Sequence, residues 1–151
     1  MHEYRATTTW RRTSADFTYE TYNRAHEVAF GGGETVPWSA APEFKGDADR
    51  VNPEEAYVAS LSTCHMLTFL AIAARRRFVV DSYVDAASGV MERTPAGKFW
   101  VSRVTLRPKV MFSGGHQPSP QEISDLHHAA HDNCFVANSV RTEVEVTVDE
   151  R

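Results

Sequence analysis

Two cysteines are the residues of this chain best suited to chemistry. Cys64 lies in a long apolar stretch between Thr63 and His65, and Cys134 follows three histidines in a later segment. A thiolate is the reactive form of cysteine, so a nearby cation activates it, and a charged His65 close to Cys64 would have this effect. Taken alone, Cys64 also fits a plain core position, because free cysteine is among the most buried residue types.

The segment before Cys134 allows more than one kind of site. His127, His131 and Cys134 share one helix face, and imidazole plus thiolate suits zinc, with Cys64 or His65 as a fourth ligand. Alternatively, Cys134 is a redox partner of Cys64, 70 positions away. In a third interpretation the histidines only form a solvated helix face. Spacing does not decide, because no C-x-x-C or H-E-x-x-H motif occurs.

Composition narrows the class of protein. The chain has 151 residues, 42% apolar and 24% charged, which predicts one globular domain over residues 1–151. A net charge of −4 argues against a nucleic-acid partner. We expect no export signal, because the first residues lack an apolar run, and no membrane contact, because no uncharged apolar stretch reaches ~18 residues. A cytoplasmic location follows, where catalytic or metal-binding cysteines are commoner than permanent disulfides.

The N-terminal third has the pattern of an antiparallel meander. Residues 3–12 are rich in threonine and aromatic side chains, and residues 17–22 and 25–30 alternate in polarity, so each segment is predicted to be a strand. The glycines at 31–33 lack the context of a phosphate loop and predict a turn. Residues 34–51 read as a loop whose length is typical of a functional flap.

A helix start follows this loop. Asn52 can cap, Pro53 suits the first helical position, and Glu55 stands where a capping box needs a carboxylate. The helix is predicted to reach about Arg76. Its middle is apolar or small on nearly every side, which predicts a position at the centre of the structure.

The C-terminal half combines strands with one more helix. Residues 78–90 and 99–112 are β-branched and aromatic and predict a long hairpin. A helix is predicted over 120–133, capped by Ser119, and alternating valines predict a strand over 139–148. The order of these elements favours an α+β fold with a mainly antiparallel sheet over a parallel βαβ sheet.

Two stretches resemble a known family. NPEEAYVASLSTCHMLTFLAIAA is similar to the central helix region of the OsmC/Ohr hydroperoxide reductases, in which the peroxidatic cysteine follows the Glu of N-P-E by ten residues, as Cys64 follows Glu54. HHAAHDNCFVANSVRTEVEVTV looks like the family's other helix, resolving cysteine and final strand, and YNRAHEVAFGGG matches more weakly. Phe135 stands where typical members have proline after that cysteine, which places the chain in an OsmC-like subgroup.

The resemblance implies a fold and a set of site residues. It implies antiparallel sheets wrapped around two central helices in an intertwined homodimer, with the active site at the subunit interface. It implies Cys64 as the peroxidatic and Cys134 as the resolving cysteine, with an Arg–Glu pair that orients and ionises the thiol. Glu54 matches the family's Glu by motif, Arg24 is the expected Arg, and Arg50 is the reserve candidate.

The resemblance also implies an activity: reduction of organic hydroperoxides to alcohols, with an external dithiol as reductant and no metal or organic cofactor. The competing interpretations are a zinc-binding protein and a non-catalytic dimer that binds a small molecule. Ten residues of straight helix separate Glu54 from Cys64 by ~15 Å, so a shared site needs a helix break or a Glu54 from the other subunit. Side chains expected to line an apolar substrate pocket are Trp38, Tyr57, Met66 and Phe135.

Overall fold

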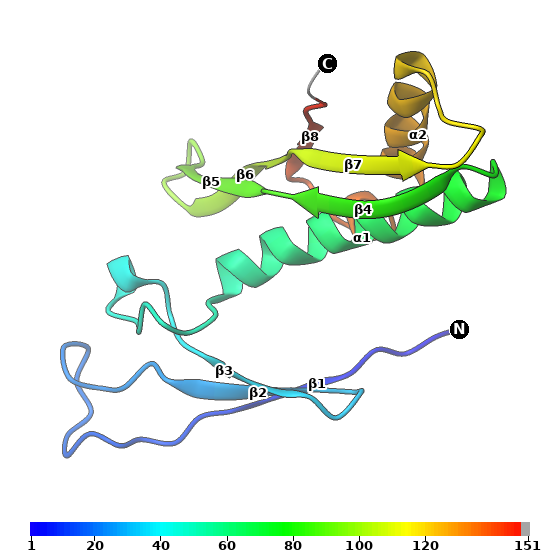
Figure 1. Ribbon diagram of the computed structural model, residues 1–151. Helices are drawn as coiled ribbons and strands as arrows, with labels where there is room; N and C mark the ends of the chain where they lie inside the picture. Colours follow the sequence, from blue (N-terminus) through cyan, green and yellow to red (C-terminus); the bar gives the residue numbers. More distant parts are fainter. Residues whose placement is uncertain (149–151) are drawn as a thin grey trace. The chain divides into compact units, whose positions relative to one another are not determined.

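The computed structural model describes residues 1–148 and shows an α+β chain (Figure 1). It contains two α-helices and eight strands in the described part of the chain. The chain divides into two compact units, Met1–Ala56 and the remainder from Tyr57, and each unit is described by itself. The prediction of a single domain over 1–151, which extends past the described residues, stays a prediction.

The first unit contains a three-stranded antiparallel sheet. Its strands are β1 (Ala6–Thr9), β2 (His26–Phe30) and β3 (Thr35–Trp38), in that order across the sheet. The glycine triplet forms the predicted turn between β2 and β3, and Gly33 adopts a φ of 96°, which suits glycine. The strand predicted over residues 3–12 is present as the shorter strand β1.

Two expectations for this unit are wrong. Residues 17–22 form turns and bends rather than a strand, because their aromatic side chains gather on Trp10: the ring centroids of Trp10 and Phe17 are 6.0 Å apart, and those of Phe17 and Tyr22 are 5.3 Å apart. The segment 34–51 is not a structureless flap either. It supplies β3 and a short 3₁₀-helix, Pro42–Phe44.

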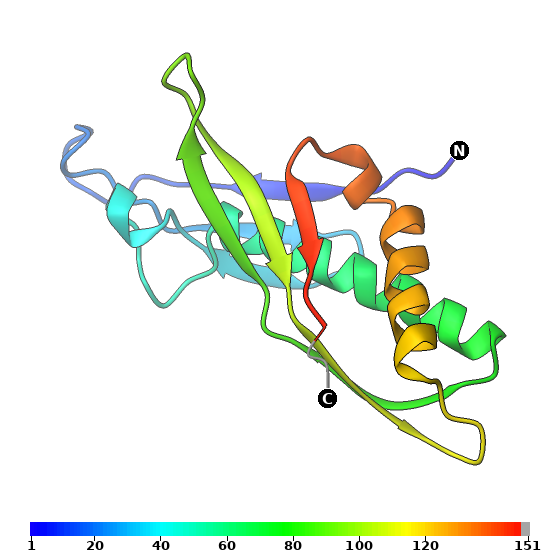
Figure 2. The ribbon, with the colours of Figure 1, turned by 90° about the horizontal axis from the view of Figure 1, so that it is seen from above.

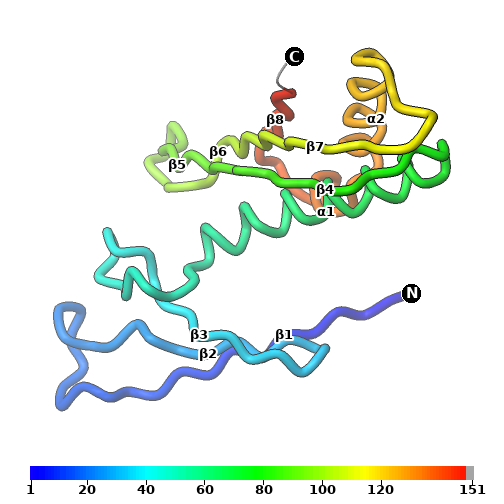
Figure 3. Tube along the Cα trace, in the orientation of Figure 1, coloured from blue at the N-terminus to red at the C-terminus, as the bar shows by residue number. Residues whose placement is uncertain are grey.

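Helix α1 (Pro53–Arg75) begins where the sequence predicts, and it can be followed as one unbroken helix in the trace (Figure 3). Asn52 caps it, because the Asn52 side-chain oxygen accepts a hydrogen bond from the backbone N–H of Glu55 at 2.9 Å. Arg77, the second residue after the helix, has a φ of 63°.

The predicted hairpin is present in the second unit, and each of its arms is divided into two strands. Strands β4 (Val79–Asp85) and β7 (Pro108–Ser113) pair antiparallel, and so do β5 (Ser88–Arg93) and β6 (Phe99–Leu106). Strand β8 (Glu143–Val146) lies beside β6 in parallel orientation (Figure 2), so the sheets are mainly but not wholly antiparallel. The last strand is shorter than predicted.

Helix α2 (Pro120–Asn133) has the predicted bounds. Ser119 accepts a hydrogen bond from the backbone N–H of Glu122, and the Glu122 carboxylate accepts one from the backbone N–H of Ser119, which completes a capping box. Cys134 follows as the C-terminal cap residue.

Helix α1 takes part in both apolar clusters of the second unit. In one cluster Phe69 and Ala73 of α1 pack with Leu126 and Ala130 of α2. In the other, Leu61 packs with side chains of β6. These clusters hold α1 against α2 and the hairpin, and they set where the two cysteines lie.

The expectation that α1 is enclosed on all sides is wrong for the single chain. Its buried residues are Leu61, His65, Phe69 and Ala73, which recur every four positions and so form one face. By length and composition α1 is the one helix in the described residues that could cross a membrane, and only 22% of its most apolar stretch is buried. Core helices of soluble proteins satisfy the same criterion, so this weak signal carries no membrane assignment.

Candidate active site

The two cysteines differ in exposure. Cys64 lies in the middle of α1 and is partly exposed, whereas Cys134 at the end of α2 is buried, with 1% of its surface accessible. Both are free thiols. The backbone N–H of Ala137, in the turn after Cys134, points to the Cys134 sulfur at 3.5 Å.

The fold brings these thiols together although 70 positions separate them. The pKa of Cys134 is raised to about 11, first because burial disfavours the thiolate and then because the Cys64 thiol lies beside it. The result is a partly exposed thiol beside a buried thiol that keeps its proton at neutral pH, an arrangement suited to a nucleophile and a second-step partner.

His65 does not supply the expected cation. It is 1% exposed, and burial, followed by the charge of His131, lowers its pKa to about 4. His65 is therefore neutral at pH 7. Its Nε2 lies 3.1 Å from Nδ1 of His127, which is also buried and whose pKa is also lowered to about 4. The sequence placed His65 beside Cys64 but gave no sign of this long-range partner.

The zinc interpretation gains no support. Among residues 1–148 no group of three or more His, Cys, Asp or Glu side chains is placed to hold a metal ion. The set His127, His131 and Cys134 is thus not assembled as ligands, because His127 turns to His65 and Cys134 turns to Cys64. Helical spacing put the three on one face without fixing where their donor atoms point.

Arg24 lies in the first unit within an aromatic surrounding. Its guanidinium Cζ is 3.6 Å from the Tyr22 ring centroid and 5.1 Å from that of Tyr19. Its Nη atoms donate to the backbone carbonyls of these two residues at 2.5 Å each, while its buried Nε has no hydrogen-bond partner. The reserve candidate Arg50 instead donates a long 3.5 Å bond to the carbonyl of His26.

Glu54 shares a feature with Arg24. One oxygen of its carboxylate is buried and has no hydrogen-bond partner. Within this unit, which the structure describes in full, no ion pair joins Glu54 to Arg24. The expected Arg–Glu pair is therefore not formed inside one chain, and a buried guanidinium nitrogen and a buried carboxylate oxygen are left without partners.

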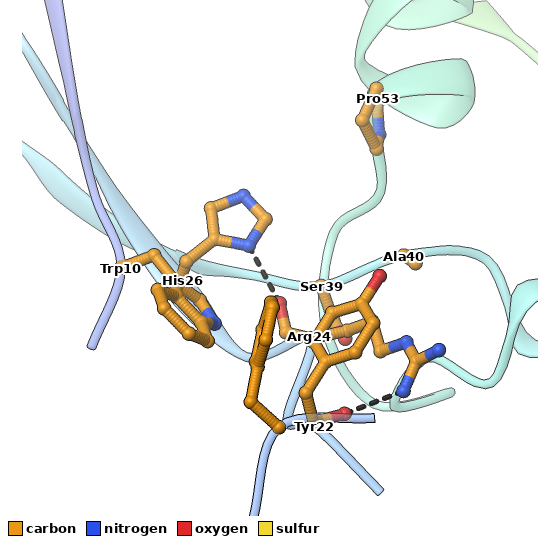
Figure 4. A pocket seen from close by; sticks show the side chains of 8 residues that line it. Trp10, Tyr22, Arg24, His26, Ser39, Ala40 and Pro53 are labelled. Carbon is orange, nitrogen blue, oxygen red and sulfur yellow. Dashed lines mark hydrogen bonds between the residues drawn. The ribbon is translucent and has the colours of Figure 1, made fainter. Parts of the chain in front are cut away.

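An open pocket of about 440 Å³ surrounds Arg24 (Figure 4). In the close-up, His26 Nδ1 contacts the Arg24 carbonyl, and the Tyr22 ring stands over the guanidinium. None of the four side chains that the sequence predicts for a substrate pocket lines this pocket, so that assignment stays a prediction. The aromatic content of residues 3–12 and 17–22 was the signal for the rings found here. The lining comprises Trp10, Phe17, Tyr22, Arg24, His26, Ser39, Ala40 and Pro53.

The fold defines a small α+β protein in which two free thiols lie near each other. A family model described as OsmC-like protein matches residues 46–149, more than half of the chain, and the chain belongs to this family. The family resemblance predicted from the sequence is confirmed. Among curated proteins no sequence matches significantly.

Solved structures agree on the fold. An OsmC-like protein of unknown function from Vibrio cholerae is 46% identical, with a TM-score of 0.95 over 99% of this chain and 100% of that one. An organic hydroperoxide resistance protein from Elizabethkingia anophelis is 20% identical, with a TM-score of 0.76 over 100% and 98% of the two chains. A protein of that description from Legionella pneumophila is 16% identical, with a TM-score of 0.71 over 99% and 98%.

The unequal thiols predict selective alkylation. At pH 8 a thiol with a pKa of about 11 is ionised in roughly one molecule in a thousand, and Cys134 is also buried. We expect iodoacetamide to modify Cys64 first and to leave Cys134 intact, as followed by mass spectrometry of peptides. In urea both should react, and in Cys64→Ser the remaining Cys134 should stay slow. Equal rates for both cysteines in the native protein would contradict this arrangement.

The buried histidines predict a pH-dependent stability. For His65 burial and then His131 lower the pKa while Asp85 opposes them, and for His127 burial, His65 and His128 lower it. Both pKa values fall from 6.5 to about 4. Between these pH values the two histidines are protonated in the unfolded chain and neutral in the folded chain. The free energy of unfolding must therefore decrease as the pH falls through this window.

We expect the urea midpoint to drop between pH 7 and pH 4.5. The free energy of unfolding should fall by at least about 2 kcal/mol, because each unit of pKa shift contributes about 1.4 kcal/mol. The double variant His65→Gln/His127→Asn, which cannot titrate there, should lose less stability over the same range. A midpoint in the unmodified protein that stays constant from pH 7 to 4.5 would show that the pair is not buried as neutral imidazoles.

Proposed function

We propose that this protein is a thiol peroxidase that reduces organic hydroperoxides to alcohols. The observation that carries the proposal is the meeting of a partly exposed Cys64 with a buried, protonated Cys134. Membership of the OsmC-like family supports it, as do structural relatives described as organic hydroperoxide resistance proteins. Those relatives share 20% identity or less with this chain, so the chemistry is argued from the thiols.

The reaction has two steps on the protein. The Cys64 thiolate attacks the distal peroxide oxygen, an S–O bond forms as the O–O bond breaks, and the alkoxide leaves as alcohol after taking a proton. The Cys134 thiol then condenses with the Cys64 sulfenic acid, which forms the disulfide and releases water. The buried position of Cys134 keeps it out of the first step and adjacent to the product of that step.

An external dithiol completes the cycle. Its two thiols are oxidised to a disulfide while the Cys64–Cys134 disulfide is reduced by exchange. The partly exposed sulfur of Cys64 is the one such a reductant can reach. The proposed cycle uses no metal or organic cofactor and takes place in the cytoplasm, without nucleic acid or membrane.

Arg24 and Glu54 are proposed to activate Cys64. A guanidinium stabilises a thiolate by charge, and a carboxylate can hold the guanidinium through paired hydrogen bonds. Arg24 Nε and a Glu54 oxygen are buried without partners in the single chain, so each has capacity for such a contact. The aromatic rings around Arg24 suit an apolar substrate, and they limit the hydration of the guanidinium.

The active unit is proposed to be a homodimer. Residues 56–74 of α1 carry no Asp, Glu, Lys or Arg, yet only one face of the helix is buried in one chain. The opposite face presents Ala59, Thr63, Leu67 and Ala71, small or apolar side chains at helical spacing that a second copy would cover. The same face lies next to Cys64, so the partner would complete the surroundings of the nucleophile.

Cysteine variants test the chemistry. Cys64→Ser should reduce cumene hydroperoxide turnover to the uncatalysed background, because no other thiol is partly exposed at this site. Cys134→Ser should complete one turnover and accumulate a sulfenic acid on Cys64, detected with dimedone by mass spectrometry. Lys98→Gln, at an exposed position in the turn between β5 and β6, serves as the control and should keep full activity.

Wild-type turnover in Cys64→Ser would refute the peroxidase proposal. Failure to trap a sulfenic acid in Cys134→Ser, with alcohol still produced repeatedly, would refute the resolving role of Cys134 and leave a one-cysteine mechanism.

A subunit-mixing experiment tests the source of Glu54. Because α1 is unbroken from Pro53 to Arg75, Glu54 and Cys64 of one chain lie ~15 Å apart along the helix, which removes the helix-break alternative. We therefore infer that Glu54 acts on the Cys64 of the partner subunit. Glu54→Gln and Cys64→Ser, each inactive alone, should regain roughly a quarter of the wild-type activity when unfolded and refolded together in equal amounts.

The recovered activity has a simple origin. Random pairing makes roughly half of the dimers mixed, and each mixed dimer holds one intact site. No recovery, with mixed dimers demonstrated by a tag on one variant, would place Glu54 and Cys64 of one site in the same chain.

A further inference from the structure

A pair of buried histidines joins the two helices that carry the thiols. His65 of α1 and His127 of α2 are 1% and 4% exposed, and their Nε2 and Nδ1 atoms lie 3.1 Å apart. The rings are nearly parallel, at 5°, with centroids 5.4 Å apart. This geometry suits an N–H···N hydrogen bond directed along a ring lone pair.

The pair leaves polar atoms unsatisfied. A neutral imidazole has one donor and one acceptor, so the shared bond uses one of each from the two rings. The outer atoms, Nδ1 of His65 and Nε2 of His127, are buried and have no hydrogen-bond partner. Apolar side chains would fill this space without such a cost, so the histidines need an explanation other than filling the core.

Their place relative to the cysteines supplies one. His65 directly follows Cys64 in α1, and His127 lies seven residues, about two turns, before Cys134 in α2. Among residues 1–148 the structure shows no other side-chain hydrogen bond between imidazole, hydroxyl, amide or carboxylate groups of the two helices. The His127 ring also packs on Phe69, one turn after His65, with centroids 4.4 Å apart.

A directional hydrogen bond at this point restrains the sliding of α1 along α2, which apolar packing alone permits. The contact of Phe69 with Leu126 is nondirectional and tolerates small slides of one helix along the other. A disulfide does not, because the two Cα atoms must come within ~7 Å with the sulfurs correctly turned. An N–H···N bond one residue from Cys64 restrains the rotation of α2 about its own axis and its position along α1.

We propose that the His65–His127 hydrogen bond is a positioning device that holds α1 and α2 in the register in which the Cys134 thiol reaches the Cys64 sulfur. The inference rests on the proposed two-thiol chemistry. His65 and His127 are positioning residues, because neither is required to touch the peroxide. Their loss should affect the condensation of Cys134 with the Cys64 sulfenic acid far more than the formation of that acid.

The experiment compares three variants at His127 and its neighbour. His127→Leu removes the bond, His127→Asn keeps an amide near the position of Nδ1, and His128→Leu is the matched control at an exposed histidine that bonds only the Ser124 carbonyl. Each full-length variant is mixed with one equivalent of cumene hydroperoxide. Quenched samples give the rate of sulfenic acid formation and, separately, the rate of disulfide formation.

We expect His127→Leu to form the sulfenic acid within about twofold of the wild-type rate and to form the disulfide about tenfold more slowly, since misplacement of reacting groups has effects of at least this size. His127→Asn should recover most of the lost rate, and His128→Leu should match the wild type. Equal slowing of both steps in His127→Leu, or no slowing of the disulfide step, would overturn the inference.

A peroxide-free arm separates this inference from the proposed function. Glutathione disulfide oxidises the two thiols to the Cys64–Cys134 disulfide and is itself reduced to two glutathione molecules. If the wild type never pairs its cysteines in this buffer, the two-thiol mechanism fails. If the wild type and His127→Leu reach the same dithiol–disulfide ratio at the same rate, only the positioning role fails.

A measurement on the unaltered protein covers the case in which His127→Leu does not fold. Imidazole ¹⁵N spectra of the wild type should show neutral rings at pH 7. They should also show a coupling between the two ring nitrogens through the N–H···N hydrogen bond. Two histidines without such a coupling, or with freely exchanging ring protons, would overturn the inference without any variant.

Discussion

The placement of the Cys64 and Cys134 thiols close to each other is the constraint on which the proposed chemistry depends. It requires the middle of one helix and the end of another to meet, and the apolar cluster of Phe69 and Leu126 provides this packing. Burial then makes the two sulfurs chemically unequal, because the Cys134 thiol, with 1% exposure and a raised pKa, holds its proton while Cys64 is partly exposed. In the proposed cycle, the difference in burial sets the order in which the two cysteines react.

The helix that carries Cys64 has only one buried face in the single chain. An apolar helix with one buried face has surface to bury elsewhere, and Arg24 and Glu54 each retain a buried polar atom without a partner. In the proposed homodimer, a second copy would cover this apolar area and bring an opposite charge to Arg24 and to Glu54. A site built from one helix per subunit would explain why the nucleophile lies beside an uncovered surface.

Much of the fold was predictable because its signals are local. Asn52 with Pro53, and Ser119 with Glu122, define helix starts through groups only three residues apart, and both helices begin there. The hairpin from β4 to β7 likewise follows from two β-rich segments and the short turn between them. The segment 17–22 was mispredicted because its aromatic alternation reflects packing on the Trp10 ring rather than pairing with a neighbouring strand.

The sequence by itself determined the family, the two helices and the identity of the reactive residue types, since motif spacing and caps depend on neighbours along the chain. Only the tertiary structure decided that His65 pairs with His127 as a neutral ring and that Cys134 is the buried thiol. It also showed that, among the described residues, His127, His131 and Cys134 are not grouped as a set of metal ligands. Charge state and donor direction depend on burial and on partners distant in sequence, and helical periodicity contains neither.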